Sequence, residues 1–177
     1  DRPALGLHEF QATKENNIIF DLHSPSVLVD TRETDPTRRY KMLGSLSGKY
    51  WSATSADGLR WKSPKEPFIR ASDNITLAQD ARTGEYLAYL RMPSTIRGLP
   101  RRTVSLSRSR DFITWSKPEL VFAPDEEDDA WATSPGQRTE VNNMSVFPHA
   151  AGFLGFPTIF RVTVTDRPKS ELGHGQS

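Results

Sequence analysis

The sequence contains no cysteine among its 177 residues. Disulfide bonds, thiolate zinc sites and cysteine nucleophiles are therefore excluded. Histidine is also scarce, and the four histidines are His8, His23, His149 and His174. Their spacing matches no metal-binding motif, so we expect no zinc site, while bound calcium stays open. The sequence also lacks a Gly-rich phosphate loop and a glycine-framed nucleotide motif, and we expect no cofactor.

Long hydrophobic runs and an excess of either charge are absent as well. No window holds about 18 successive apolar residues, so no segment is predicted to span a membrane. The 23 basic and 22 acidic residues leave a net charge of +1, which provides no overall field to attract nucleic acid or an anionic membrane. Charge is instead local, in an acidic run over residues 125–129 and in a basic cluster of Arg97, Arg101, Arg102, Arg108 and Arg110. We interpret both as solvated loops.

What the sequence does contain is an internal repeat. Residues 55–61 (SADGLRW) and 109–115 (SRDFITW) both read S-x-D-x-x-x-W and lie 54 residues apart. An alternating strand pattern precedes each copy, at residues 48–54 and 102–107, and a short apolar segment follows it, at residues 67–69 and 120–122. We expect the Asp of each copy to accept backbone N–H bonds within its turn, and the Trp to pack between neighbouring sheets.

The repeat predicts an all-β protein. One unit reads as strand, acidic turn, strand, loop, strand, S-x-D-x-x-x-W turn and final strand, which is a four-stranded antiparallel meander of about 50 residues. Such a period is typical of a β-propeller, in which each sheet packs its faces against the next. The alternative is a two-sheet sandwich with similar hairpins. Helical spacing of apolar residues is scarce, and 13 prolines interrupt the chain.

These features resemble the five-bladed propeller glycosidases, the superfamily that includes invertases, levansucrases, arabinanases and β-xylosidases. The S-x-D-x-x-x-W turn is similar to the blade turn of that group. Residues 76–86 (TLAQDARTGEY) resemble its second-blade motif, and residues 137–140 (QRTE) followed by 144–148 (MSVFP) resemble its third-blade segment. The resemblance implies a glycoside hydrolase-like protein that acts on or binds an oligosaccharide or polysaccharide.

The chemistry of that superfamily needs two carboxylates flanking the glycosidic bond. The resemblance makes Glu140 the candidate general acid and Asp80 the candidate carboxylate that orients it; the alternative for Asp80 is a turn residue, like Asp35 in the first unit. Where the superfamily opens its first blade with Asp-Pro, this chain has Ser24-Pro25. Asp21 is an alternative source of the missing carboxylate. The departure favours a second hypothesis, a non-catalytic carbohydrate-binding or structural remnant of such an enzyme.

Further polar and aromatic side chains are candidates for substrate binding. They are His23, Arg91, Trp131, Arg138 and Arg161. Arginines bind sugar or carboxylate groups, but they also pair with acidic loops. A tryptophan stacks on a sugar ring or packs against a neighbouring blade.

The chain is short for a closed five-bladed propeller, which needs roughly 250 residues. We expect a single domain over residues 1–165 with about three blades, at residues 24–69, 74–122 and 140–165, and a flexible tail over residues 166–177. Open blades expose sheet faces and edges, which promotes association. The predicted partners are therefore carbohydrate and a second copy of the chain in a homodimer, with no nucleic acid and no membrane.

Overall fold

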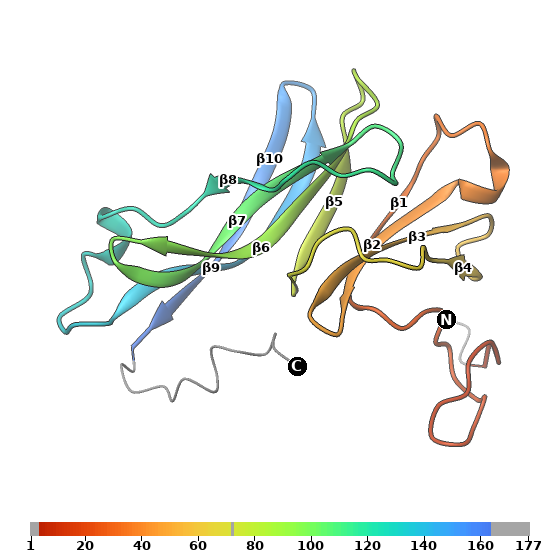
Figure 1. Ribbon diagram of the computed structural model, residues 1–177, viewed down its shortest axis with the longest axis horizontal. Coiled ribbons are helices and arrows are strands. Elements are labelled where there is room, and N and C mark those ends of the chain that lie inside the picture. Colours follow the sequence, from red (N-terminus) through yellow and green to blue (C-terminus); the bar gives the residue numbers. More distant parts are fainter. Residues whose placement is uncertain (1–3, 72, 164–177) are drawn as a thin grey trace.

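The computed structural model describes residues 4–71 and 73–163, and this part of the chain is almost entirely β-structure (Figure 1). The first sheet is an antiparallel meander in which each strand pairs with the next along the chain. Its strands are β1 (His23–Val29), β2 (Tyr40–Leu46), β3 (Lys49–Ser55) and β4 (Trp61–Lys62). A short 3-10 turn, η1 (Pro36–Arg38), lies between β1 and β2.

The second sheet repeats the same topology. Its strands are β5 (Ile75–Gln79), β6 (Tyr86–Ile96), β7 (Leu99–Ser109) and β8 (Glu119–Phe122). The central hairpins of the two sheets have equivalent turns, because Ser47-Gly48 and Arg97-Gly98 are two-residue loops with positive φ at both positions. That conformation matches the twist of paired strands. The predicted all-β fold of four-stranded antiparallel meanders is confirmed.

The S-x-D-x-x-x-W turns are built as the sequence predicts. Asp57 accepts hydrogen bonds from the backbone N–H groups of Leu59 and Arg60, at 2.9 and 2.8 Å. Asp111 accepts the equivalent bonds from Ile113 and Thr114, at 2.8 and 2.7 Å. The bonds from Arg60 and Leu59 lower the pKa of Asp57. Each carboxylate is therefore used to close its own turn.

The two tryptophans of the repeat have different surroundings. Trp115 lies 4.8 Å from the ring of Phe68, which belongs to the first unit, so it packs between the sheets as predicted. Trp61 instead donates its indole N–H to the Gly58 carbonyl within its own turn. The core between the two sheets therefore contains Trp115 and not Trp61.

The main core lies between the two meanders. Leu43, Tyr50, Leu90 and Phe112 are almost fully buried there. Aromatic rings run through the core in contact with one another, with centroid separations of 4.8–6.3 Å. Burial of these apolar surfaces holds the first sheet to the second.

A hairpin of two long strands, β9 (Arg138–His149) and β10 (Gly152–Val162), forms the third sheet. Strand β9 contacts β5, β6 and β7, whereas β10 is exposed over most of its length. In Figure 1 the hairpin lies beside the second sheet, on the side away from the first. The described part of the predicted third blade thus has two strands, and the predicted tail over residues 166–177 lies outside the described residues.

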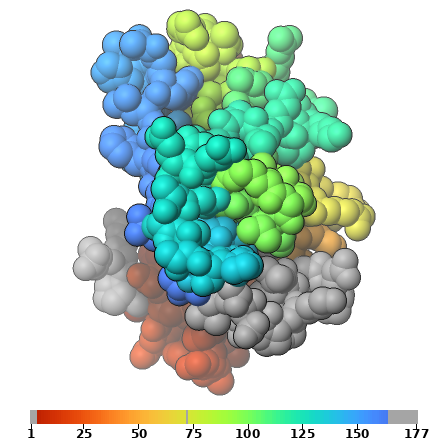
Figure 2. Space-filling model, turned by 90° about the vertical axis from the view of Figure 1, so that its left-hand side faces the viewer, coloured from red at the N-terminus to blue at the C-terminus, as the bar shows by residue number. Residues whose placement is uncertain are grey.

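The segment between β8 and β9 contains the 3-10 turn η2 (Glu127–Asp129) and lies beside the β6–β7 hairpin (Figure 2), with the Arg97 guanidinium donating to the Pro124 and Asp125 carbonyls. Asp129 lies at its centre and binds Arg97 and Arg101, with N–O separations of 2.5 and 2.7 Å. Arg101 is buried rather than solvated. The prediction that the basic cluster is a solvated loop is therefore wrong for Arg101, which is buried on β7 and paired with Asp129 of the acidic run.

Candidate functional site

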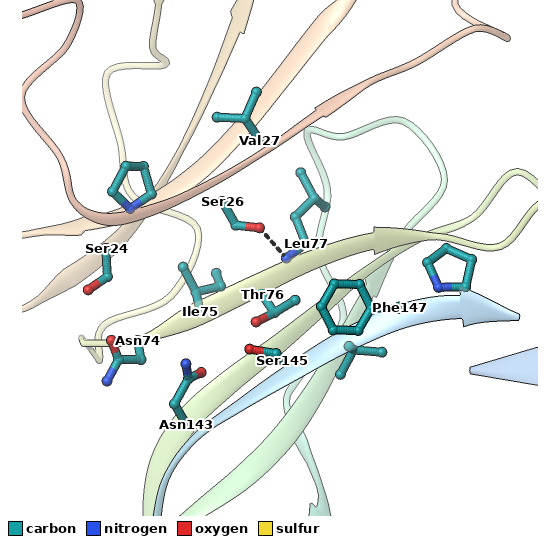
Figure 3. Close-up of a pocket in the computed structure, with 13 residues that line it drawn as sticks. Ser24, Ser26, Val27, Asn74, Ile75, Thr76, Leu77, Asn143, Ser145 and Phe147 are labelled. Atoms are coloured by element: carbon teal, nitrogen blue, oxygen red, sulfur yellow. Dashed lines mark hydrogen bonds between the residues drawn. The ribbon is translucent and has the colours of Figure 1, made fainter. Parts of the chain in front are cut away.

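The first strands of the three sheets lie side by side and enclose a groove of about 520 Å³ (Figure 3). Two side-chain hydrogen bonds connect these strands. The Leu77 N–H donates to Ser26 Oγ at 2.9 Å, joining β5 to β1, and Thr76 Oγ1 donates to the Met144 carbonyl at 2.9 Å, joining β5 to β9. The groove is therefore positioned by all three sheets at once.

The groove lining is polar but uncharged. It consists of hydroxyl, amide and apolar side chains from residues 24–27, 74–77, 143 and 145–148. Its size lies within the usual range of small-molecule sites. None of its lining residues is an Asp, Glu, Lys, Arg or His, so the groove itself offers neutral donors and acceptors.

Two residues with strained backbone conformations lie at one end of this groove. Ser24 has a φ of 47°, next to an irregularity in the pairing of β1 with β2, and Asp73 has a φ of 143° just before β5. Non-glycine residues in such conformations cost on the order of 1–3 kcal/mol and cluster at binding and catalytic sites. Ser24 is the second residue of β1 and Asp73 lies two residues before β5, so both strained residues are near the start of the first strand of a sheet.

Asp73 connects several of the predicted site residues. Its carboxylate pairs with the Arg91 guanidinium and lies 3.7 Å from His23 Nε2. Arg91 Nη1 also donates to Asn142 Oδ1 at 3.2 Å, which links β6 to β9. Burial lowers the pKa of Arg91, and the Asp73 carboxylate opposes that effect. The structure thus brings His23 and Arg91 together around an aspartate that the sequence analysis did not select.

Glu140 is buried on β9, with an exposed fraction of 4%. Arg138 binds one of its oxygens through two nitrogens, both at 2.8 Å, and Arg102 Nε lies 3.5 Å from the other oxygen. Arg102 also lies 3.5 Å from Asn142 Oδ1. The carboxyl of Glu140 is therefore engaged by guanidinium groups, and a chain of polar contacts runs from it through Asn142 to Arg91 and Asp73.

Asp80 lies in the turn between β5 and β6, at the opposite end of β5 from Asn74. Its carboxylate accepts a hydrogen bond from the Arg82 N–H at 2.8 Å, and this bond lowers the pKa of Asp80. A five-residue strand is about 17 Å long, so Asp80 is far from the strained end of the groove. The geometry favours the turn residue over the carboxylate that orients Glu140. Asp21, the other alternative, lies beside the turn between β2 and β3 and not in the groove lining.

Trp131 and Arg161 contact each other away from the groove lining. The Arg161 guanidinium lies 5.2 Å from the centre of the Trp131 ring, and the indole N–H donates to Thr139 Oγ1 at 2.9 Å. One face of the ring is thus covered by the arginine. This contact anchors the segment before β9 and leaves less of the ring for stacking on a sugar.

Ser24, His23 and Asp73 contain the residue types of a hydrolytic triad, but their geometry differs from one. Ser24 Oγ lies 3.1 Å from His23 Nε2, and Asp73 Oδ1 approaches the same nitrogen. A triad needs the nucleophile and the acid on opposite ring nitrogens. The three residues are therefore better placed to contact a ligand than to activate a serine.

Asp73 and Asn142 are the site residues that sequence reasoning missed. The repeat held a usable signal for Asp73, because it stands just before the first strand of the second unit, as Ser24 stands at the start of the first strand of the first unit. Asn142 gave no such signal. It is the extra residue at a register shift between β9 and β10, which is visible only in the strand pairing.

Within residues 4–71 and 73–163, no cluster of three or more His, Asp or Glu side chains is arranged to hold a metal ion. The same described part of the chain has no helix that is long and apolar enough to cross a membrane.

The sequence matches no protein-family profile and no curated protein. Solved structures do resemble it. A GH43 protein from Bacillus licheniformis superposes with a TM-score of 0.51 at 15% identity, over 80% of this chain and 29% of that one. At a TM-score of 0.44 and 17% identity, a structure of the GH130 family of mannoside phosphorylases covers 82% of this chain and 46% of its own. A protein from Bifidobacterium bifidum described as an exo-β-1,3-galactanase covers 80% and 49%, with a TM-score of 0.44 and 11% identity.

The likeness to the GH43 protein shows that the chain has a glycoside hydrolase-like fold, and at this identity it shows the fold alone. The chain spans between less than a third and about half of the length of these three structures. The function of the chain therefore has to be argued from its own groove.

Proposed function

We propose that this protein binds a neutral oligosaccharide or polysaccharide in the groove between β1, β5 and β9. The observation that carries the proposal is the lining, which combines hydroxyl and amide groups with apolar side chains and contains no charged residue. A sugar ring presents hydroxyl groups at its edge and C–H groups on its faces, so it matches both kinds of surface. An anionic or cationic ligand finds no counter-charge in that lining.

The strained end of the groove supports the same proposal. Ser24 and Asp73 are held in unfavourable backbone conformations where His23, Asp73 and Arg91 meet. Such strain persists only where surrounding contacts fix it, and it is common where side chains are aimed at a ligand. Asp73 retains partial exposure, so its carboxylate can accept hydrogen bonds from sugar hydroxyl groups while it pairs with Arg91.

Glycoside hydrolysis is the second candidate, and the observation that favours it is the polar chain between two carboxylates. Asp73 and Glu140 are linked through Arg91, Asn142 and Arg102 across β6, β7 and β9. Hydrolysis needs one carboxylic acid and one carboxylate on opposite sides of the bond. Because guanidinium groups engage both carboxylates and the groove lining is uncharged, saccharide binding is the better-supported function.

The test is titration of the protein with neutral and uronic-acid oligosaccharides by calorimetry. Asn143 lines the groove, and Asn143→Ala should weaken binding at least about fivefold, the loss of roughly one hydrogen bond. The matched control is Asn17→Ala, an exposed amide in the N-terminal segment, which should bind like the parent. Failure of the parent to bind any neutral saccharide would contradict the proposal.

Glu140→Gln separates the two candidates. If the parent releases sugar from a bound oligosaccharide and Glu140→Gln stops the release while binding is retained, hydrolysis becomes the leading function. If neither protein hydrolyses and both bind, the binding function stands. A thermal melt of the variant is the control for folding, since Glu140 is buried against Arg138 and Arg102.

A further inference from the structure

The groove between β1, β5 and β9 continues onto one face of the β9–β10 hairpin. Residues that are paired across antiparallel strands point to the same side of their sheet. Three groove-lining residues of β9 are paired in this way with three residues of β10: Asn143 with Thr158, Ser145 with Phe156 and Phe147 with Leu154. We call these three β10 residues the hairpin shelf. The shelf adjoins the groove and is not part of its lining.

Phe147 connects the groove to the shelf. Its ring packs edge to face against Phe156, with the ring centroids 6.0 Å apart and an angle of 67° between the ring planes. Phe156 and Leu154 nevertheless have exposed fractions of 61% and 48%. Both rings lie on long paired strands, so the backbone beneath them is held in place before a ligand binds. Exposed apolar side chains that form one contiguous patch mark a binding surface.

Charge on this face of the hairpin is confined to its two ends. Glu140 and Arg138 lie at the end where β9 begins and pair with each other, and His149 lies at the turn between the two strands. Between these ends the face carries apolar side chains, hydroxyl groups and one amide. The groove lining contains the same mixture, so the shelf extends the chemistry of the groove.

The groove is also open toward the shelf. Phe147 lines the groove and is 55% exposed, so the groove is accessible to solvent at the residue that contacts Phe156. A ligand chain bound in the groove can therefore leave it over Phe147. A closed pocket would instead limit the ligand to the length of the pocket.

We infer that the ligand is a saccharide chain longer than the groove, and that a sugar outside the groove stacks on Phe156 of the shelf. The inference rests on the proposed function and narrows its ligand to an extended chain. An aromatic ring presents an apolar face to the C–H groups of a sugar, while a neighbouring hydroxyl such as that of Thr158 binds the hydroxyl groups at the edge of the sugar. From Asn143 to Phe147 the strand spans about 13 Å, which is longer than one sugar ring. Groove and shelf together form a surface for several linked sugars.

The test is calorimetric titration with linear gluco-, xylo-, manno- and galacto-oligosaccharides, each supplied as a disaccharide and as a hexasaccharide of the same linkage. Phe156→Ala should bind the hexasaccharide of the preferred series about fivefold more weakly than the parent, because a stacking contact is lost. Its affinity for the disaccharide should equal that of the parent, because the groove lining is unchanged. Phe156→Trp retains an aromatic face and should bind the hexasaccharide at least as tightly as the parent.

The matched control is Ile113→Ala, which removes an apolar side chain of similar exposure (63%) in the turn before β8. It should bind both saccharides like the parent. Thermal melts of the three variants show that each remains folded, and light scattering of the parent and Phe156→Ala shows whether the shelf is a contact between two copies of the chain.

The outcomes separate this inference from the proposed function. A parent that binds no saccharide of either length overturns both. A parent that binds, together with a Phe156→Ala variant that has unchanged affinity for the hexasaccharide or equally weakened affinity for both lengths, retains the proposed function and overturns the extended chain. A dimeric parent that becomes monomeric in Phe156→Ala also overturns the inference, because the shelf would then be covered by a second copy.

Discussion

The contact between the first and second sheets differs in kind from the contact between the second sheet and the β9–β10 hairpin. The first is an apolar core with one buried cation, Lys41, at its edge. The second combines a small apolar patch, in which Phe153 packs against Ala78, Leu87 and Leu106, with contacts of Arg91 and Arg102 to Asn142 and Glu140 on β9. The first contact resembles the interior of a domain, whereas the second leaves polar groups beside the groove.

The difference indicates that one contact contributes mainly to stability and the other mainly to ligand binding. Apolar burial stabilises a fold without specifying which polar atoms face a ligand, whereas hydrogen-bonded ion pairs fix side-chain directions at modest gain in stability. The strained residues Ser24 and Asp73 lie where the second kind of contact begins. We therefore expect changes in the first contact to act mainly on stability and changes in the second to act mainly on binding.

Lys41→Met should have the largest effect on stability. Lys41 is fully buried, with Nζ 2.6 Å from Glu33 Oε2 and 2.7 Å from the Arg38 carbonyl. Its loss leaves the buried Asp30 without its cation and Glu33 with Arg38 alone, at 3.8 Å, at a cost of about 3–5 kcal/mol. Urea denaturation measures the change.

Arg91→Met is the matched change at the second contact. Arg91 is partly exposed, and its partners Asp73 and Asn142 can bind water in its absence, so the expected loss of stability is about 1.5 kcal/mol or less. Saccharide affinity should fall more than in Lys41→Met. If Arg91→Met destabilises the fold as much as Lys41→Met does, the proposed division between the two contacts is wrong.

Asp129→Asn should have an intermediate effect that depends on pH. The hydrogen bond from Arg101 is the main cause that lowers the pKa of Asp129, and Arg97 contributes further. A folded-state pKa below the ordinary value of 3.8 means that the carboxylate stabilises the fold above that pH, and the contribution disappears as the pH falls below it. The variant should lose about 1.5–3 kcal/mol at pH 7 and progressively less toward pH 2.

Urea denaturation of parent and variant across this pH range measures the difference between them, which removes the contribution of the other carboxylates. A difference that stays constant with pH would show that Asp129 acts through packing and not through its charge.

The meanders could be predicted from the sequence because their determinants are local. A carboxylate two residues after a serine closes each turn through nearby backbone N–H groups, and alternating residues specify the strands on either side. The site could be predicted only in part. Glu140, Arg91 and His23 lie in one polar network with Asp73, whereas Asp80 lies at the other end of β5, and the roles assigned to these residues stay predictions.

The choice between Asp80 and Asp73 depends on which end of β5 faces the other sheets, and the pattern of residues around the strand does not contain that information. The same information is missing for the arginines of the basic cluster. Arg101 and Arg102 are adjacent in sequence but point to opposite faces of β7, where one binds Asp129 and the other approaches Glu140. Local periodicity gives that alternation, but not which neighbour covers each face.

The smallest predicted effect compares the two repeat turns. Asp111→Ala should cost about 1 kcal/mol, because its turn holds Phe112 and Trp115 in the core between the sheets and its carbonyl accepts from Arg38 of the first unit. Asp57→Ala should lower the melting temperature less, since its turn carries Trp61, which bonds within the turn itself. Thermal melts of the two variants measure the order. If the Asp57 variant has the lower melting temperature, the turns stabilise the chain through their local hydrogen bonds alone. The apolar contact between the sheets would then not depend on the turn that positions Phe112 and Trp115.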